Sequence, residues 1–350
     1  MYVKKVEVKD FRNYDEGKVE FTKGTNVICG ANAKGKTNIL ESIFLLATSK
    51  SHRGATEREL IKNGEEFAKV KIDFFARGRE NTGEIRIKKK KQFKMNKIPI
   101  IKTSDLMGFL NAVMFCPEDL RIIKGAPRER RRFLDIGISQ VRSGYFHKLI
   151  EYNKILNQRN ACLREGLEDT WVWDEQLAKT GARIFWYRRN YLLELEKNAA
   201  IHMKDISNEK LSLKYMIDKE REEDYRLEIL SGLQKNKERE RRWKQTLSGP
   251  HRDDFSIEIN GLDARHFASQ GQVRTAVMAM KLAEVDIMKR ETGEPPVLLL
   301  DDALSELDEE RQKYILKKSG DAQVIITCTS AKKFEGVKII KVDDIRCTHM

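Results

Sequence analysis

The residues best suited to do chemistry lie near the start of the chain, between an expected strand and an expected helix. Gly30-Ala-Asn-Ala-Lys-Gly35-Lys36-Thr37 matches the pattern GxxxxGK[ST]. Such a loop turns consecutive backbone N–H groups and a helix N-terminus toward phosphate groups. Lys36 would reach the β- and γ-phosphates, and the Thr37 hydroxyl would ligate Mg²⁺. The pattern therefore predicts a nucleoside-triphosphate site.

A second set of polar residues ends a continuous apolar run. Val297–Asp302 reads VLLLDD, and a run without polar alternation is typical of a strand covered on both faces. An acidic residue at the end of such a strand, near a phosphate loop, holds Mg²⁺ directly or through water. We assign that role to Asp301 and expect Asp302 to polarise the attacking water. The alternative is an aspartate pair that caps the following helix.

The third segment, Ser269-Gln270-Gly271-Gln272, opens an expected helix. A serine hydroxyl, a glycine and a helix N-terminus can together bind a phosphate. Because Lys36 already holds the γ-phosphate, a second phosphate site is explained if each nucleotide is sandwiched between two copies of the chain. A serine that only caps its helix is the simpler interpretation of these four residues.

Strands and helices must position these segments. The expected elements are strands at 1–28 and 68–97, a helix at 38–48, helices across 121–240 and, from Phe255 on, strands around a helix from Gln272 to about Arg290. We therefore expect an α/β domain built from both ends of the chain, at 1–117 and 246–350. A helical second lobe at 118–245 interrupts it.

The amino-acid composition limits the classes of partner that this chain is expected to bind. The 350 residues carry a formal net charge of +13, which favours polyanions: nucleic acid first and an anionic membrane surface second. A soluble protein that is merely rich in lysine is the alternative. No apolar run is long enough to predict a transmembrane helix. The five cysteines are scattered along the chain without a CxxC pair, which fits a reducing cytoplasm and argues against a zinc site.

Two basic clusters could contact the phosphates of DNA. The first lies in the alternating segment 85–97 and contains Lys88, Lys89, Lys90, Lys91 and Lys94. Alternation would put Lys89 and Lys91 on one face and Lys88 and Lys90 on the other; a solvated edge strand is the alternative. The second cluster contains Arg121, Lys124, Arg128, Arg130, Arg131 and Arg132, and some of these arginines could brace the lobe interface instead. Because aromatic residues are sparse near both, duplex backbone is favoured over single-strand stacking.

Longer segments carry a resemblance to known proteins. The order of phosphate loop, SQGQ, LLLDD and SELD (305–308) resembles the ABC ATPases of the SMC type. Within that group the chain is similar to the RecF family of bacterial DNA replication and repair proteins. The segments that carry this closer similarity are KDFRNY (9–14), GKTNILESI (35–43), CPEDLRIIKGAPRERRRFLD (116–135), SGPHRDD (248–254), FASQGQVRTAVMAMKLAE (267–284) and VLLLDDALSELD (297–308).

The resemblance implies an ABC-type ATPase head with a helical second lobe and no long coiled coil. It implies ATP and Mg²⁺ as cofactors, ATP-driven head-to-tail homodimerisation on double-stranded DNA, and slow, DNA-stimulated hydrolysis that releases the dimer. It also implies gap repair and replication restart after DNA damage in the cytoplasm. There the protein would act at junctions of single- and double-stranded DNA, helping RecO and RecR to load RecA.

The resemblance also implies residue roles. The nucleotide would be contacted by Gly30, Ala31, Asn32, Ala33, Lys34, Gly35, Lys36, Thr37 and Asn38, with Phe11, Arg12, Asn13 and Arg53 nearby. Asp301 matches the Mg²⁺ aspartate and Asp302 the catalytic acid, with Glu118 near the loop that senses Mg²⁺ and water. Ser269, Gln270, Gly271 and Gln272 match the signature that acts in trans. Asp308 ends the loop that couples the two sites.

Three positions depart from the wider group. Ala33 stands where many SMC-type loops carry glycine, which is tolerated if its φ is negative. Asp302 is one methylene shorter than the glutamate of transporter ATPases. The strand TCTS (327–330) lacks the transporter histidine and leaves Thr327 or Thr329 as candidates. The last two departures predict slow turnover, a switch and not a motor.

Three other functions make predictions that the sequence does not meet. A transporter ATPase subunit, working with a partner other than DNA, predicts a glutamate and a histidine at the positions where this chain has Asp302 and TCTS. A DNA-end tether needs a long heptad arm, and residues 121–240 are too few and too interrupted. A fused nuclease module has too few residues available after Asp308.

Overall fold

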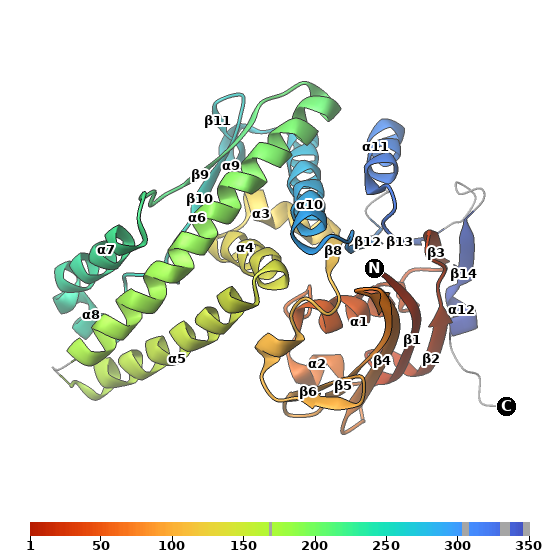
Figure 1. Ribbon diagram of the computed structural model, residues 1–350, viewed down its shortest axis with the longest axis horizontal. Coiled ribbons are helices and arrows are strands. Elements are labelled where there is room, and N and C mark those ends of the chain that lie inside the picture. Colours follow the sequence, from red (N-terminus) through yellow and green to blue (C-terminus); the bar gives the residue numbers. More distant parts are fainter. Residues whose placement is uncertain (168–169, 303–307, 330–336, 346–350) are drawn as a thin grey trace. The chain divides into compact units, whose positions relative to one another are not determined.

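The computed structural model describes residues 1–167, 170–302, 308–329 and 337–345 (Figure 1). The chain divides into two compact units, the first formed by Met1–Asp119 with Met278–Met350 and the second by Leu120–Val277. No helix within the described ranges is long and apolar enough to cross a membrane.

An antiparallel sheet forms one layer of the first unit. Its strands follow the order β2-β1-β4-β5-β6-β7. They are β1 (Tyr2–Phe11), β2 (Tyr14–Glu20), β4 (Ala68–Ala76), β5 (Arg79–Ile87), β6 (Lys91–Met95) and β7 (Ile98–Ile100). Buried and more exposed residues alternate along β4, as expected of a sheet with one face on the core.

A parallel sheet forms the second layer of the same unit. Its order is β14-β3-β13-β12-β8. The strands are β3 (Thr25–Cys29), β8 (Ala112–Phe115), β12 (Val297–Asp301), β13 (Val324–Cys328) and β14 (Lys338–Lys341). All five residues of β12 are buried, as the apolar run predicts. The carboxyl ends of parallel strands meet at one edge, and this edge positions the residues discussed below.

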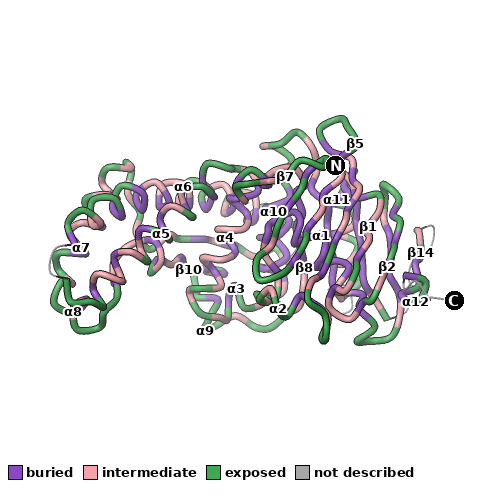
Figure 2. The backbone as a smooth tube through the Cα atoms, turned by 90° about the horizontal axis from the view of Figure 1, so that it is seen from below, coloured by how far each residue is buried: buried purple, intermediate pink, exposed green. Residues whose placement is uncertain are grey.

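Helix α1 (Lys36–Thr48) contacts strands of both sheets and is buried along most of its length (Figure 2). The shorter helices of this unit are α2 (Glu57–Leu60), η1 (Thr103–Leu106), η2 (Pro117–Leu120), α11 (Glu309–Ser319) and α12 (Val342–Ile345). Since α1 begins directly after the phosphate loop, its burial fixes the loop against the core.

The second unit is built on long helices. These are α3 (Arg121–Lys124), α4 (Pro127–Val141), α5 (Ser143–Glu165), α6 (Trp171–Ser207), α7 (Glu222–Lys235), α8 (Lys237–Trp243) and α9 (Ala264–Phe267). Helix α6 contacts α4, α5 and α7. Helix α8 is mostly exposed, so its charged residues, KERERR (237–242) apart from the buried Glu240, form a solvated helix face (Figure 2).

A small sheet completes the second unit. It has the order β11-β10-β9, with β9 (Leu211–Tyr215), β10 (Phe255–Ile259) and β11 (Leu262–Asp263). The predicted lobe boundary at 245/246 therefore differs from the compact unit, which runs on to Val277. The reason is strand pairing, because β10 pairs with β9 and carries the residues after 246 into this unit. Helix α10 (Gln270–Thr292) is continuous across the boundary.

A cluster of polar side chains lies in the core of the second unit. Arg188 of α6, only 2% exposed, donates to Asp135 at 2.8 Å and to Asp253 at 3.2 Å. The hydroxyls of Tyr145 and Tyr215 donate to the same two carboxylates. We call these five residues the Arg188 cluster. Asp253 belongs to the SGPHRDD segment, so that segment serves the interior of this unit.

Candidate nucleotide site

The phosphate loop needs glycine where it meets the first sheet. Gly35, the N-cap of α1, has φ +101, a value that side chains with a Cβ rarely adopt. A Cβ there would lie 2.7 Å from Asn13 Oδ1 and 2.8 Å from a ring carbon of Tyr14. The loop is therefore packed tightly against β1–β2, and its shape is set before any phosphate arrives.

Ala33 does not have the negative φ that would make alanine an unstrained replacement for glycine in this loop. Its φ is +64, whereas tolerance of alanine required a negative value. The left-handed region brings Cβ close to the following carbonyl oxygen and costs about 1–2 kcal/mol for a residue other than glycine. The loop thus holds a strained residue in the middle of the predicted phosphate cradle.

Lys36 lies inside the loop. Its ammonium group donates to the carbonyl oxygens of Gly30 at 2.7 Å and Ala31 at 3.1 Å, and the residue is 4% exposed. A lysine so placed can hold the β- and γ-phosphates of a nucleotide against the loop.

The start of α1 and the ends of β12 and β13 bring the predicted Mg²⁺ ligands together. The Thr37 hydroxyl donates to Asp301 Oδ1 at 2.7 Å, and the Thr327 hydroxyl donates to the same oxygen at 2.8 Å. Burial raises the pKa of Asp301, although both hydroxyl donors act to lower it. The oxygen donor set fits Mg²⁺, which prefers hard oxygen ligands. Thr37 and Asp301 would hold the ion, which would neutralise charge on the phosphates.

The two candidates for the hydrolytic step lie at the same edge. Asp302 has φ +48 and donates its backbone N–H to Thr327 Oγ1 at 2.9 Å. Glu118 is exposed in η2, directly after β8, and β8 is the parallel neighbour of β12. Thr327 and Thr329 are the two candidates for the position of the transporter histidine. Thr327 is buried on Asp301, while Thr329 is exposed.

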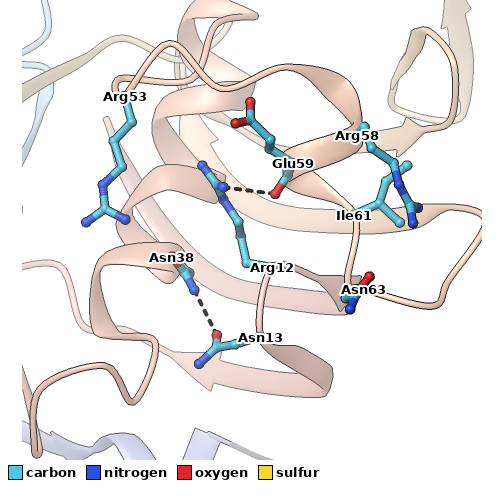
Figure 3. Close-up of a pocket in the computed structure, with 8 residues that line it drawn as sticks. All are labelled: Arg12, Asn13, Asn38, Arg53, Arg58, Glu59, Ile61 and Asn63. Atoms are coloured by element: carbon cyan, nitrogen blue, oxygen red, sulfur yellow. Dashed lines mark hydrogen bonds between the residues drawn. The ribbon is translucent and has the colours of Figure 1, made fainter.

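A pocket of about 590 Å³ lies beside the loop (Figure 3). It is lined by Arg12, Asn13, Asn38, Arg53, Arg58, Glu59, Ile61 and Asn63. Arg53 points into it in Figure 3, and its charge also acts on Asp301. Four of the lining residues were predicted to lie near the nucleotide, whereas Phe11 is fully buried in the core.

Arg12 is positioned by a residue that sequence reasoning missed. Its guanidinium donates to both oxygens of Glu41 at 2.8 and 2.9 Å and to the Glu59 carbonyl at 2.8 Å. Glu41 is fully buried in α1, and Ser51 donates to it as well. The signal was an acid within the apolar helix NILESIFLLAT, because a buried carboxylate requires a cationic partner.

Asn13 and Asn38 tie the loop to the first sheet. Asn38 Nδ2 donates to Asn13 Oδ1 at 2.8 Å, and Asn13 Nδ2 donates to the Ala33 carbonyl at 3.4 Å. Asn32 and Lys34 are exposed. The loop residues thus leave one side of the cradle to solvent.

The SQGQ segment forms a complete N-cap in the second unit. Ser269 Oγ accepts from the Gln272 backbone N–H at 3.2 Å, and Gln272 Oε1 accepts from the Ser269 N–H at 2.9 Å. Gln272 also donates to Glu209 at 2.6 Å, and Ser269, Gln270 and Gly271 are exposed. The simpler capping role is therefore present, and it also holds an exposed helix N-terminus in a fixed shape.

Lys124 stiffens the approach to that segment. Its ammonium group donates to the carbonyls of Arg265 at 2.9 Å, Ala264 at 3.2 Å and Ala268 at 3.3 Å.

Asp308 caps α11 by accepting from the Arg311 N–H at 2.9 Å. The other residues of the predicted SELD loop, Ser305, Glu306 and Leu307, lie outside the described residues.

The two basic clusters differ in exposure. Lys88, Lys89 and Lys90 do not alternate on a strand as predicted, because β5 ends at Ile87 and these residues form the exposed turn before β6. Lys94 is exposed, while Lys91 pairs with Glu57 at 3.2 Å.

Arg130 is a correction to the predicted DNA-contacting set. It is 5% exposed and binds both oxygens of Asp254 at 2.7 and 2.9 Å, so it serves the interior of the second unit. Arg131 is half-buried and donates to the Asp253 carbonyl at 2.6 Å. Arg128 remains exposed.

Comparison with known proteins gives the family. The family described as RecF/RecN/SMC N terminal domain matches residues 2–346. The DNA replication and repair protein RecF of Clostridium acetobutylicum is 43% identical over 351 residues, covering 98% of this chain and 96% of that protein. RecF of Clostridium tetani is 44% identical over 364 residues, covering 99% of each. The chain belongs to the RecF family.

Solved structures agree with this assignment. One described as the recombination mediator protein RecF-ATPrS in the RecFOR pathway is 42% identical, with a TM-score of 0.91 over 97% of this chain and 95% of that one. A RecF-ATP structure is 41% identical, with the same TM-score and coverage. An Smc head, 17% identical over 97% of this chain and 94% of that one, shares the fold at a TM-score of 0.55. These matches confirm the predicted ABC-type ATPase head of the RecF and SMC kind.

Proposed function

We propose that this RecF-family chain is an ATP-dependent DNA-binding protein of DNA replication and repair. ATP with Mg²⁺ binds at the phosphate loop, and the SQGQ segment of a second copy completes the site head to tail. The joined copies hold double-stranded DNA, and slow hydrolysis releases them. The roles of the individual site residues belong to this proposal.

The proposal of nucleotide binding is supported by the residues at the carboxyl edge of the parallel sheet. Lys36 is enclosed by the loop that would take the phosphates, and Thr37 meets Asp301 at 2.7 Å. Similar RecF structures are named for ATP and ATPrS. This agreement supports ATP as the nucleotide.

The observation that carries the two-copy site is the state of the SQGQ segment. Its helix N-terminus is exposed, capped by its own side chains, and stiffened by Lys124. A rigid, exposed N-terminus with a serine hydroxyl is suited to a phosphate that is already held on another side. The γ-phosphate bound by a second copy fits that description.

The proposal of DNA binding rests on exposed positive charge, and the proposal of partner proteins rests on the names of the relatives. Lys88, Lys89 and Lys90 form an exposed tip, and a tip of positive side chains is sufficient for sequence-independent phosphate contacts. The relatives are named for DNA replication and repair and for the RecFOR pathway. We infer that junctions of single- and double-stranded DNA are the target and that RecO and RecR, and through them RecA, are the partners.

Slow hydrolysis follows from the two residues at the end of β12 and β13. The Asp302 side chain is one methylene shorter than the glutamate of transporter ATPases. Its backbone N–H donates to the Thr327 hydroxyl, which in turn donates to Asp301. We predict that Asp302→Asn retains ATP-driven dimerisation but traps the dimer, whereas Lys36→Arg weakens dimer formation. Size-exclusion chromatography with ATP, followed by dilution, measures both. An Asp302→Asn protein that cycles normally removes that aspartate from the catalytic role.

The decisive experiment measures binding to a short DNA duplex by fluorescence anisotropy, with and without ATP. Ser269→Arg should abolish the gain in DNA affinity that ATP gives, because arginine blocks the signature while leaving Lys36 intact. Ser143→Arg, an exposed serine at the start of α5, is the matched control and should behave as wild type.

Two results would contradict the proposal. If ATP changes neither the oligomeric state nor the DNA affinity of the wild type, the clamp is excluded. If ATP drives dimerisation without any effect on DNA binding, the alternative of an ABC ATPase that works with a partner other than DNA is favoured.

A further inference from the structure

Two cysteines that are 299 residues apart in sequence lie side by side at the base of the phosphate loop. Cys29 is the last residue of β3 and Cys328 the last residue of β13, and the parallel register pairs them directly. Their Sγ atoms are 3.4 Å apart. The scattered spacing of the cysteines in the sequence gave no sign of this pair.

The backbone positions are compatible with a disulfide. Neighbouring strands lie about 4.7–4.9 Å apart, and disulfides span Cα separations of about 4.4–6.8 Å. The sulfur atoms would approach by about 1.4 Å to reach the bonded distance. Cys29 is 8% exposed and Cys328 is more exposed, so the Cys328 thiol is the one that a small solute reaches first.

Both cysteines are covalently next to the nucleotide site. Gly30, the first loop residue, follows Cys29 and donates its N–H to the Cys328 carbonyl at 3.3 Å. The Gly30 carbonyl accepts from Lys36. Thr327, which precedes Cys328, contacts Asp301. One sulfur–sulfur bond would therefore connect the phosphate loop with the strand that supports the Mg²⁺ aspartate.

We propose that Cys29 and Cys328 form a reversible oxidation site that controls nucleotide binding, with a hydroperoxide as the oxidant. The Cys328 thiolate attacks one peroxide oxygen, the O–O bond breaks, and a sulfenic acid forms as hydroxide leaves and takes up a proton to become water. The Cys29 thiol then attacks the sulfenic sulfur, the S–O bond breaks, and a second water leaves. Two thiols are oxidised to one disulfide, and one hydrogen peroxide is reduced to two waters.

Neighbouring strands are about 4.7–4.9 Å apart, whereas the Cβ atoms of a disulfide are about 3.5–4.5 Å apart, so closure of the bond draws the ends of the two strands together. The strand bodies cannot follow, because Ile28 and Ile326 are fully buried in the sheet. The shift therefore falls on Gly30, Ala31 and Thr327, whose oxygens position Lys36 and Asp301. Because displacements of about 1 Å are enough to disable a precisely positioned site, the oxidised protein binds ATP more weakly.

The test uses the purified full chain treated with hydrogen peroxide. Intact mass should show the loss of two hydrogen atoms, and peptide mapping should recover the Cys29–Cys328 crosslink. Affinity for a fluorescent ATP analogue should fall about tenfold or more and return after treatment with dithiothreitol. By linkage, saturating ATP should shift the thiol–disulfide equilibrium of this pair in a dithiothreitol buffer toward the reduced form.

Matched variants separate the pair from other thiols. Cys328→Ser should keep the ATP affinity of the reduced wild type and lose its response to peroxide. Cys162→Ser, at a cysteine in the second unit, should respond as wild type. A crosslink that leaves ATP affinity unchanged, or oxygen addition without a crosslink, overturns the proposal. Since the reduced wild type is measured first, a failure to bind ATP at all would contradict the proposed function instead.

Discussion

The nucleotide site of the first unit and the Arg188 cluster of the second use polar side chains in opposite ways. At the nucleotide site, Asn32 and Lys34 face solvent and Ala33 is held at positive φ. In the cluster, Arg188 is fully buried against Asp135 and Asp253. The first arrangement gains its best contacts only with a phosphate present, whereas in the second the Arg188 guanidinium finds its partners within the fold.

This difference shows that a distinctive motif need not be a ligand site. SGPHRDD is as recognisable as the phosphate loop, yet its Asp253 and Asp254 bind Arg188 and Arg130 inside the second unit. A buried ion pair contributes little net stability, but removal of one partner leaves an uncompensated charge. Replacement of one such residue therefore lowers stability even though the intact ion pair adds little to it.

The largest effect is expected from Arg188→Leu. It leaves the buried Asp253 and the half-buried Asp135 without their cation and should lower the free energy of unfolding by about 3–5 kcal/mol, as measured by urea denaturation. The adjacent Arg189→Leu removes a more exposed pair with Asp218 and should cost less than about 1 kcal/mol. Equal losses in the two variants would show that the cluster is not what holds this unit together.

A smaller, pH-dependent effect is expected from His251. Burial lowers its pKa to about 4, while its ring nitrogens lie 2.7 Å from the Tyr152 hydroxyl and 3.0 Å from the Thr246 carbonyl. The unfolded chain binds this proton near pH 6.5 and the folded chain does not, so stability falls as the pH drops from 6.5 to 4. The loss from this residue is roughly 2–3 kcal/mol.

His251→Gln should therefore flatten the decline in stability on acidification. Other shifted groups remain in both proteins, among them His52, whose pKa burial also lowers to about 4, and Asp253, whose pKa burial raises to about 6. Asp253 acts in the opposite direction, because its folded form takes up a proton first. Urea denaturation of both proteins at pH 7 and pH 4.5 gives the difference, and identical declines would exclude the role of His251.

The smallest effect is expected at the phosphate loop. Ala33→Gly removes the strain of φ +64 and should raise the free energy of unfolding by about 1 kcal/mol, with ATP affinity kept. Ala31→Gly, at a loop residue without positive φ, should lower stability by roughly 0.5–1 kcal/mol. If both changes act in the same direction, the strain assigned to Ala33 is absent.

The sequence was sufficient where chemistry and local pattern coincide. The phosphate loop precedes a helix, and Val297–Asp301 is a buried strand, because both features depend on neighbouring residues alone. It was not sufficient where burial depends on distant partners. Arg130 looked like a surface cation until Asp254, from a segment far along the chain, was placed beside it. Glu41, Thr327 and the Cys29–Cys328 pair are of the same kind.

The order of strands in the parallel sheet also constrains how this chain comes to be folded during synthesis. Strand β3 emerges early, but both of its neighbours, β13 and β14, are made near the end. At about 5–20 residues per second, the ribosome leaves β3 without a partner strand for on the order of tens of seconds. Residues 120–277 are contiguous and can fold during that interval. The nascent chain thus carries an unpaired apolar strand, ending in Cys29, at a stage when chaperones rather than β-strands must cover it.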